Sequence, residues 1–183
     1  MNTEILTHVK KITDQLINIL SSFSQTDINK IPFEGSWSAA QVGKHLFKSY
    51  GVVDILTAPV KKTNRAPDEK VESIKSVFLN FDIKMSSPEF ITPSAQLIEK
   101  EALLNSLKDR TSKILEISES LDLSETCTAF SLPGSGEFTR LEWLYFILYH
   151  TQRHIAQLKN IQQIINADRV VNIHNNDQSG DLP

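Results

Sequence analysis

The sequence predicts an all-α protein, a four-helix bundle with up-down-down-up topology. Four segments of about 20 residues repeat apolar side chains every three or four positions, the spacing of one face of a helix. Six of the 183 residues are glycine, a low content that disfavours a turn-rich sandwich or barrel. A long polar connection, residues 58–91, separates the second and third segments. Such a connection can cross the whole bundle, so we expect these two helices to run parallel.

The first two helices are predicted from apolar spacing and from one start signal. The apolar face of the first helix consists of Ile5, Val9, Ile12, Leu16, Leu20 and Phe23. The polar cluster at residues 24–27 ends that helix. The second helix begins after Ser38, which can form a capping box with Gln41. Pro59 then stops it, because proline cannot continue a helix.

The connection over residues 58–91 is expected to cover a functional site, since long loops in a compact domain are seldom idle. It can hold one short helix, which would begin at Asp68 and reach Phe78. The third helix of the bundle is expected to start at Thr92 as its N-cap, with Pro93 at the first helical position. Its apolar face is predicted to contain Leu97, Leu104, Leu107, Thr111, Ile114 and Leu121.

The fourth helix is predicted over residues 141–165 and is the most apolar of the four. A sharp turn, Pro-Gly-Ser-Gly at 133–136, precedes it. Thr139 and Glu142 then form a second potential capping box. Together these signals indicate a well-defined start for this helix.

Length and composition indicate one domain. Apolar residues make up 40% of the chain and charged residues 22%, as in ordinary globular proteins. The chain after Ala167 is polar and asparagine-rich, so it has little apolar surface to offset its conformational entropy. We therefore expect a bundle over residues 1–166 and a flexible tail over residues 167–183.

Charge and cysteine content exclude several classes of protein. The net charge of −3 disfavours a dedicated nucleic-acid binder. The single cysteine, Cys127, cannot form an internal disulfide and is expected to be a small buried side chain. No secretory signal is visible, and the longest apolar run, residues 143–149, is too short to span a bilayer. These features lead us to expect a cytoplasmic protein that binds neither membrane nor nucleic acid.

The histidines carry the candidate chemistry. His150 and His154 are spaced four residues apart, which places both on one helix face with their Cβ atoms about 5–6 Å apart. His45 shares its side of the second helix with apolar neighbours, so its ring also needs a partner in the interior. Three imidazoles can hold a transition-metal ion and leave positions open for water or substrate. The alternative is that the histidines are half-buried and simply hydrogen-bonded. Thr151 follows His150, so the zincin motif H-E-x-x-H is absent.

Three stretches around these histidines form a recognisable pattern. They read WSAAQVGKHL at 37–46, LEW at 141–143 and HTQRHIAQL at 150–158. This pattern resembles the DinB-like (YfiT-type) superfamily, and the match covers residues 5–165. The resemblance implies a metal-binding four-helix bundle, often a homodimer, whose metal ligands correspond to His45, His150 and His154.

Other residues near the pattern have open roles. Gln157 either orders the metal site or is a surface amide. Many members of the superfamily carry an acidic residue after the first histidine of the pair, and Thr151 occupies that position here. Arg153 is expected to form a salt bridge to a neighbouring helix or a subunit contact. His8 and His174 match no motif and are expected at the surface.

The favoured function is a metal-dependent hydrolase or a low-molecular-weight thiol transferase acting on a small molecule. The ion, zinc or nickel first and iron or copper as alternatives, would activate either a bound water or a thiolate; no side chain is assigned as the catalytic group. Lys61, Lys62 and Arg65 could attract an anionic substrate or could form a solvated loop. The alternative function is a non-catalytic dimeric bundle, since the apolar run at 143–149 covers more than one side of its helix.

Overall fold

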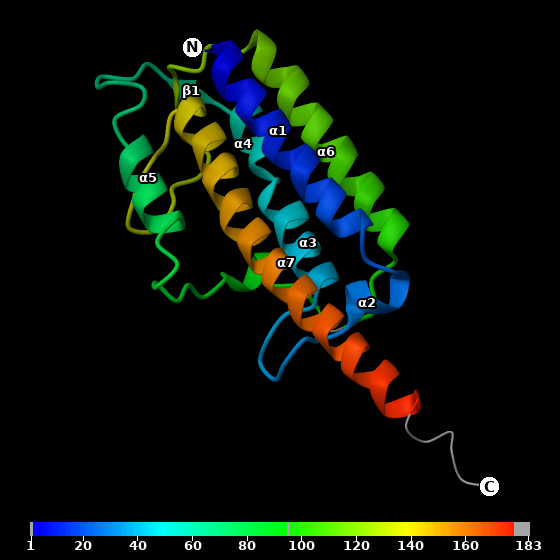
Figure 1. Cartoon of the computed structure of the whole chain (residues 1–183). Helices are drawn as coiled ribbons and strands as arrows, with labels where there is room; N and C mark the ends of the chain where they lie inside the picture. Colours follow the sequence, from blue (N-terminus) through cyan, green and yellow to red (C-terminus); the bar gives the residue numbers. More distant parts are fainter. Residues whose placement is uncertain (1, 95, 178–183) are drawn as a thin grey trace, which may run out of the picture.

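A computed structural model describes residues 2–94 and 96–177, and its long helices form a four-helix bundle (Figure 1). The bundle helices are α1 (Asn2–Ser21), α3 (Ala39–Ser49) continued by α4 (Val52–Thr57), α6 (Lys100–Ser120) and α7 (Arg140–Asp177). Helix α1 packs against α6 and α7, and α3 packs against the same two helices from the other side. The core lies between them.

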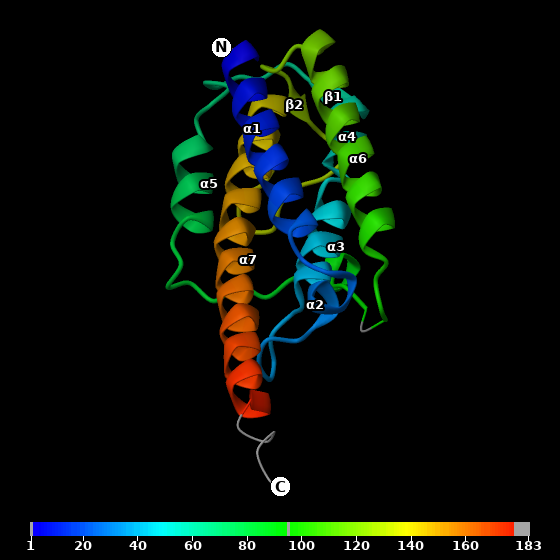
Figure 2. The same ribbon diagram turned by 45° about the vertical axis from the view of Figure 1, so that its right-hand side comes forward.

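Contacts at the helix ends confirm the up-down-down-up topology. The start of α6 lies at the end of α1, because Lys100 Nζ donates to the Phe23 carbonyl at 3.2 Å. The start of α3 also lies near α6, since Gln41 Nε2 donates to the Ser94 carbonyl at 3.1 Å. Helix α7 begins where α4 ends, where Arg140 Nε donates to the Leu56 carbonyl at 2.9 Å. Helices α3 and α6 therefore run parallel, as Figure 2 shows.

Both predicted capping boxes are present. The Gln41 amide donates to Ser38 Oγ at 3.2 Å, and the Ser38 amide donates to Gln41 Oε1 at 2.9 Å. At the start of α7, the Glu142 amide donates to Thr139 Oγ1 at 3.1 Å and the Thr139 amide to Glu142 Oε2 at 2.9 Å. These reciprocal bonds satisfy backbone donors that have no partner inside the helix, so they set where α3 and α7 begin.

The predicted start of the third helix at Thr92 is wrong, because α6 begins at Lys100. Thr92 instead ends a short 3₁₀ turn, η1 (Glu89–Ile91). The chain before α6 is held by side chains near α2 (Gln25–Asn29): Asn29 bonds both backbone groups of Ile98. The side chain of Asn29 thus satisfies the amide and the carbonyl of Ile98, which a helix would otherwise do with backbone hydrogen bonds. Leu97, expected on the apolar face, is 70% exposed.

Two other helix ends differ from expectation. The second predicted helix is broken into α3 and α4 at Gly51, whose amide turns back to the Lys48 carbonyl at 3.0 Å. The polar cluster at 24–27 ends α1 as expected, but it also starts α2. Helix α7 continues to Asp177, past the expected end at Ile165, and residues 178–183 of the expected tail lie outside the described part.

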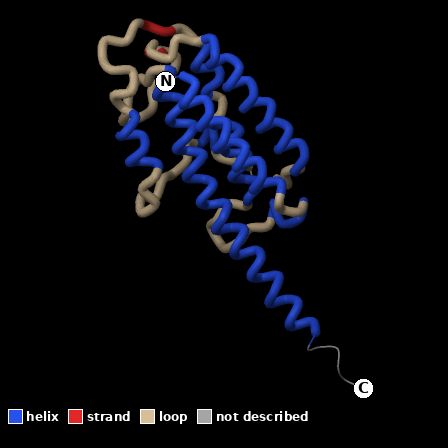
Figure 3. The backbone as a smooth tube through the Cα atoms, turned by 45° about the horizontal axis from the view of Figure 1, so that its top comes forward, coloured by secondary structure: helices blue, strands red, loops and turns tan. Residues whose placement is uncertain are grey.

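The connection between α4 and α6 contains short elements of its own. It holds β1 (Val60–Lys61), α5 (Val71–Phe78) and η1. Strand β1 pairs antiparallel with β2 (Thr126–Cys127) at the end of the bundle that contains the N-terminus (Figure 3). Helix α5 confirms the short helix predicted to reach Phe78, although it begins at Val71 and not at Asp68, and it packs along α7. We call residues 58–99 the crossover.

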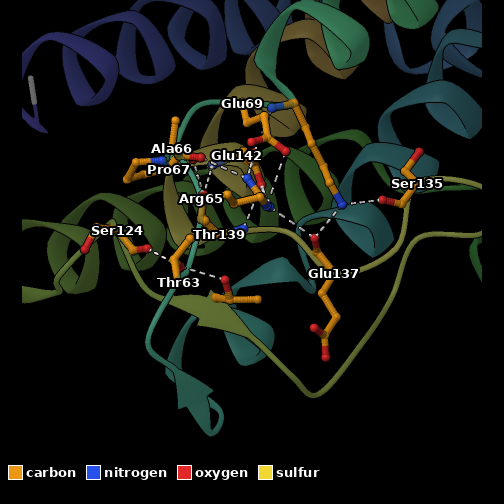
Figure 4. Close-up of polar contacts among 12 residues, drawn as sticks. Thr63, Arg65, Ala66, Pro67, Glu69, Ser124, Ser135, Glu137, Thr139 and Glu142 are labelled. Atoms are coloured by element: carbon orange, nitrogen blue, oxygen red, sulfur yellow. Dashed lines mark hydrogen bonds and ion pairs between the residues drawn. The ribbon is translucent and has the colours of Figure 1, made fainter.

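The first half of the crossover is anchored on the start of α7 by a buried ion pair (Figure 4). Arg65 donates from its two terminal nitrogens to the two oxygens of Glu142 at 2.6 and 2.7 Å. Glu142 is 0% exposed, and its hydrogen bonds raise the pKa of Arg65. Lys61 forms an ion pair with Glu137. These two cations are thus partnered within the chain.

Two further expectations concern burial and membranes. Cys127 is fully buried, and burial raises the pKa of its thiol to about 11, as expected for an inert small side chain. Among the described helices, none has a stretch of apolar residues long enough to cross a bilayer.

Candidate metal centre

The structure brings all three predicted histidines to one point between α3 and α7. His150 and His154 lie one turn apart on α7, and His45 lies in the middle of α3. The Nε2 atom of His150 is 3.1 Å from Nε2 of His45 and 3.0 Å from Nε2 of His154. One nitrogen from each ring lies within 4.8 Å of the other two. We call these residues the histidine triad.

The outer nitrogen of His45 determines which form of this ring faces the centre. His45 Nδ1 lies 3.1 Å from the Ile91 carbonyl and 3.1 Å from Ser87 Oγ. A carbonyl oxygen can only accept, so Nδ1 carries the hydrogen. In the neutral ring, Nε2 then has a free lone pair. His45 therefore presents the nitrogen form that binds metal.

Gln157 performs the same task for His154. The distance between His154 Nδ1 and Gln157 Oε1 is 2.8 Å, so the ring hydrogen points at the amide oxygen and Nε2 is again free. Hydrogen bonds of this kind to the second ring nitrogen are typical of histidine metal ligands. Of the two roles expected for Gln157, the geometry favours ordering of the site over a surface amide.

The convergence is difficult to satisfy with hydrogen bonds alone. His150 Nε2 faces two lone pairs, and one imidazole nitrogen can donate a single hydrogen. Two nitrogen ligands at about 2.0–2.1 Å from one ion lie about 3.3 Å apart in tetrahedral geometry and about 2.9 Å apart at a right angle. The two separations from His150, 3.0 and 3.1 Å, fall within this range, and the nitrogens of His45 and His154 lie within 4.8 Å of each other. The residues thus fit one transition-metal ion.

The second nitrogen of His150 differs from those of the other two rings. Its Nδ1 atom is buried and has no hydrogen-bond partner among the described residues. The aromatic rings of Phe78 and Phe146 flank the imidazole, with centroids at 5.3 and 5.2 Å. His150 is therefore held in place by packing on aromatic rings.

The surroundings keep the triad neutral. Burial lowers the pKa of His150 well below its ordinary value, and the nearby His154 and His45 lower it further. Burial, with the neighbouring His45, lowers the pKa of His154 to about 3. Burial also lowers the pKa of His45, against the effect of its bond to Ile91. Three neutral rings near neutral pH have the protonation state that metal binding requires.

Thr151 links the two helices that carry the triad. Its Oγ1 atom lies 2.7 Å from the hydroxyl of Tyr50 at the end of α3, and both residues are buried. Burial raises the pKa of Tyr50 above its ordinary value. Thr151, which stands where an acidic residue was expected from the resemblance, thus makes a buried contact between α7 and α3. Among the described residues, the candidate site groups three imidazoles without a carboxylate.

Sequence reasoning missed the partners that come from the crossover. The Ile91 carbonyl is a backbone group and Ser87 lies in no motif, so nothing in the sequence marks their contact with His45. Among the described residues, Arg153 forms no salt bridge to a neighbouring helix; the expected subunit contact stays a prediction. Arg153 donates instead to backbone carbonyls of the crossover.

The remaining two histidines lie apart from the triad. His8 is exposed on α1, as expected. His174 lies in the part of α7 whose side chains fall outside the described residues.

The fold and the site together place the protein in the class of four-helix bundles that carry a candidate three-histidine metal site on their second and fourth helices. The family model described as the DinB superfamily matches residues 8–158, and the chain belongs to this superfamily. A relative, YuaE of Bacillus subtilis (strain 168), is 25% identical over 152 residues, which is 81% of this chain and 91% of that protein.

Two solved structures share the fold. YfiT from Bacillus subtilis, described as a probable metal-dependent hydrolase with an unusual four-helix bundle topology, has a TM-score of 0.59 and 15% identity. The match covers 90% of this chain and 87% of YfiT. TT2238, a four-helix bundle protein, has a TM-score of 0.55 and 17% identity over 87% of this chain and 99% of its own. At these identities the likeness establishes the fold.

Proposed function

We propose that the protein is a metal-dependent enzyme that acts on a small molecule, as a hydrolase or as a low-molecular-weight thiol transferase. The histidine triad would hold one divalent transition ion, with zinc or nickel as first candidates and iron or copper as alternatives. The observation that carries the proposal is the convergence of three Nε2 atoms with separations of 3.0 and 3.1 Å. The description of YfiT as a probable metal-dependent hydrolase supports the same conclusion.

Each residue of the site has a defined task in this proposal. His45, His150 and His154 supply neutral nitrogen ligands and leave further positions on the ion open. The Ile91 carbonyl and Gln157 hold two of the rings in the required form. An ion bound there supplies Lewis-acid chemistry, which activates water in a hydrolase or a thiol in a transferase. The surrounding aromatic rings limit the access of bulk water.

The two chemistries are distinguished by supplying different co-reactants. Zinc-loaded and nickel-loaded protein would be incubated with a panel of esters and amides, and separately with a low-molecular-weight thiol and an electrophile. We expect turnover in one of the two assays and its loss in His150→Ala. The exposed His8→Ala variant is the matched control and should retain activity. Metal-loaded protein that turns over substrates in neither assay would contradict the proposal.

A second candidate function is a dimeric bundle that acts by binding. Tyr145 and Tyr149 stack on α7 with centroids 5.8 Å apart, and both are only partly buried. Apolar and aromatic side chains on an open helix face favour contact with a second copy of the chain. Light scattering on Tyr149→Glu tests this: a dimer that becomes monomeric supports the interface. A wild-type dimer that takes up no metal would favour the binding function over the enzyme.

We also propose a cytoplasmic location for this enzyme. Cys127 is a buried free thiol, and such unpaired cysteines fit a reducing compartment. Fractionation of the native host would test this placement, and recovery outside the cytoplasm would contradict it.

A further inference from the structure

The crossover covers two rings of the histidine triad, His45 and His150. Ser87 and Ile91 contact the His45 ring, and Phe78 packs against the His150 ring. His45 is 3% exposed and His150 is 6% exposed. His154 is half-buried, whereas the rings of His45 and His150 are covered, so a small molecule reaches those two rings only if the covering chain moves. The segment after α5 makes this cover as it passes from the α5 side of α7 to α3 (Figures 1 and 2).

Arg153 fastens one end of this cover. One terminal nitrogen of its guanidinium donates to the carbonyls of Phe78 at 3.2 Å and Asn80 at 2.8 Å, and the other donates to the carbonyl of Ile83 at 2.6 Å. Carbonyls at the end of a helix lack partners within the helix and attract cations, so the end of α5 suits a guanidinium. Arg153 is also the residue directly before His154. The turn of α7 that carries a triad histidine thus holds the cover.

Lys48 fastens the other end from α3. Its Nζ atom donates to the Thr92 carbonyl at 2.7 Å, and it lies one helical turn after His45. Both ends of the segment are therefore held by a cation located next to a triad histidine. We call residues 79–92 the cover segment.

Little apolar burial holds the middle of the cover segment. Four of its large apolar side chains are exposed: Phe81 59%, Ile83 41%, Met85 45% and Phe90 67%. Segments with few buried apolar contacts open at a low free-energy cost. The hydrogen bonds at the two ends, with those of Ser87 and Ile91 to His45, are thus the main restraint on its opening.

We propose that the cover segment is a lid over the histidine triad and that Arg153 is its latch. Opening the lid uncovers the His45 side of the triad and withdraws the Ile91 carbonyl from His45 Nδ1, so ligand access and the orientation of His45 are coupled. Arg153 is a positioning residue in this scheme, because it acts on the site through the lid. The role of the lid in metal access rests on the proposed function, whereas the latch itself is independent of it.

Two variants of Arg153 separate a latch from a simple charge effect. Arg153→Ala removes both the bonds and the charge, whereas Arg153→Lys keeps the charge and loses the planar guanidinium that reaches three carbonyls. Arg110→Ala is the matched control, since Arg110 lies over the Phe47 ring between α6 and α3 and, among the described residues, forms no hydrogen bond with the lid. Hydrogen exchange of residues 79–92 in metal-free protein measures opening. Transfer of zinc to a coloured chelator measures access.

If Arg153 is a latch, hydrogen exchange of the cover segment and zinc transfer should both become faster in both variants. Hydrogen bonds from a charged donor are strong enough that losing them should raise hydrogen exchange in the cover segment about tenfold or more. Zinc transfer should accelerate by a similar factor, while Arg110→Ala behaves as wild type. A pure charge effect predicts the reverse pattern: removing a cation near the ion slows zinc release in Arg153→Ala and leaves Arg153→Lys unchanged.

Each outcome has one consequence. Faster exchange confined to the cover segment in both variants supports the lid. Unchanged exchange in both, or the charge pattern in zinc release, overturns it. Faster exchange in a protein that binds no zinc supports the lid and overturns the metal function, so the two failures are distinguishable.

Discussion

Replacing Glu142 by glutamine should destabilise the fold strongly, because one buried carboxylate organises the start of α7 and the crossover together. Its oxygens accept two hydrogen bonds from Arg65 and one each from the Lys70 amide at 2.9 Å and the Thr139 amide at 2.9 Å. Glu142→Gln keeps the size of the side chain. It replaces one acceptor oxygen with a donor that faces other donors.

The magnitude follows from burial. Breaking a buried ion pair costs about 3–5 kcal/mol because the remaining charge is left unpaired. Arg65 is 18% exposed, so water recovers part of that cost, and we expect a loss of about 3 kcal/mol. For a chain of this length that corresponds to a decrease in Tm of roughly 6–12 °C.

Glu69→Gln is the matched control for this prediction. Glu69 is 56% exposed and lies 3.9 Å from Arg65, so its loss should cost less than about 0.5 kcal/mol. Urea unfolding followed by circular dichroism measures both variants. If Glu142→Gln were no less stable than Glu69→Gln, the ion pair would not anchor the crossover and the reasoning would be refuted.

Three other predictions concern the site and the thiol. Gln157→Leu should weaken zinc affinity about 10–100-fold with unchanged helix content, because His154 loses the partner that sets its tautomer; equal affinity by titration calorimetry would contradict this. The metal-free protein should lose stability in acid. The ordinary histidine pKa is 6.5 and that of His154 in the fold is about 3, so the contribution of the neutral ring is complete above pH 6.5 and decreases as the pH falls toward 3. From pH 7.5 to pH 5 the free energy of unfolding should fall by about 2 kcal/mol from His154 alone, and a flat urea-unfolding profile would be inconsistent with buried neutral rings. Cys127, with a pKa of about 11 and no exposure, should resist a thiol reagent in native protein at pH 8 and react after unfolding; rapid native labelling would disprove its burial.

The sequence predicted correctly those features that depend on residues close together in the chain. Ser38 with Gln41 and Thr139 with Glu142 form their capping boxes within four residues, so their partners are visible in the sequence. The i, i+4 spacing of His150 and His154 likewise follows from helix geometry. His45 was added to the pair because it shares its side of the second helix with apolar residues and because its stretch of sequence is part of the superfamily pattern.

The features that sequence reasoning missed depend on distant backbone groups. The side chain of Asn29, distant in sequence, bonds the backbone of Ile98, so α6 begins at Lys100 and not at the predicted Thr92. Backbone carbonyls are present at every residue and leave no mark in the sequence, so the contacts of His45 with Ile91 and of Arg153 with the crossover could not be predicted.

The central claim is that three ring nitrogens bind one ion, and X-ray absorption on zinc-reconstituted protein tests it most directly. We predict one zinc per chain, three imidazole nitrogens at about 2.0–2.1 Å, and loss of the ion in His45→Ala, His150→Ala or His154→Ala with helix content retained. A wild-type protein that stays metal-free after reconstitution with zinc and with nickel, or an ion with fewer than three imidazole ligands, would contradict it.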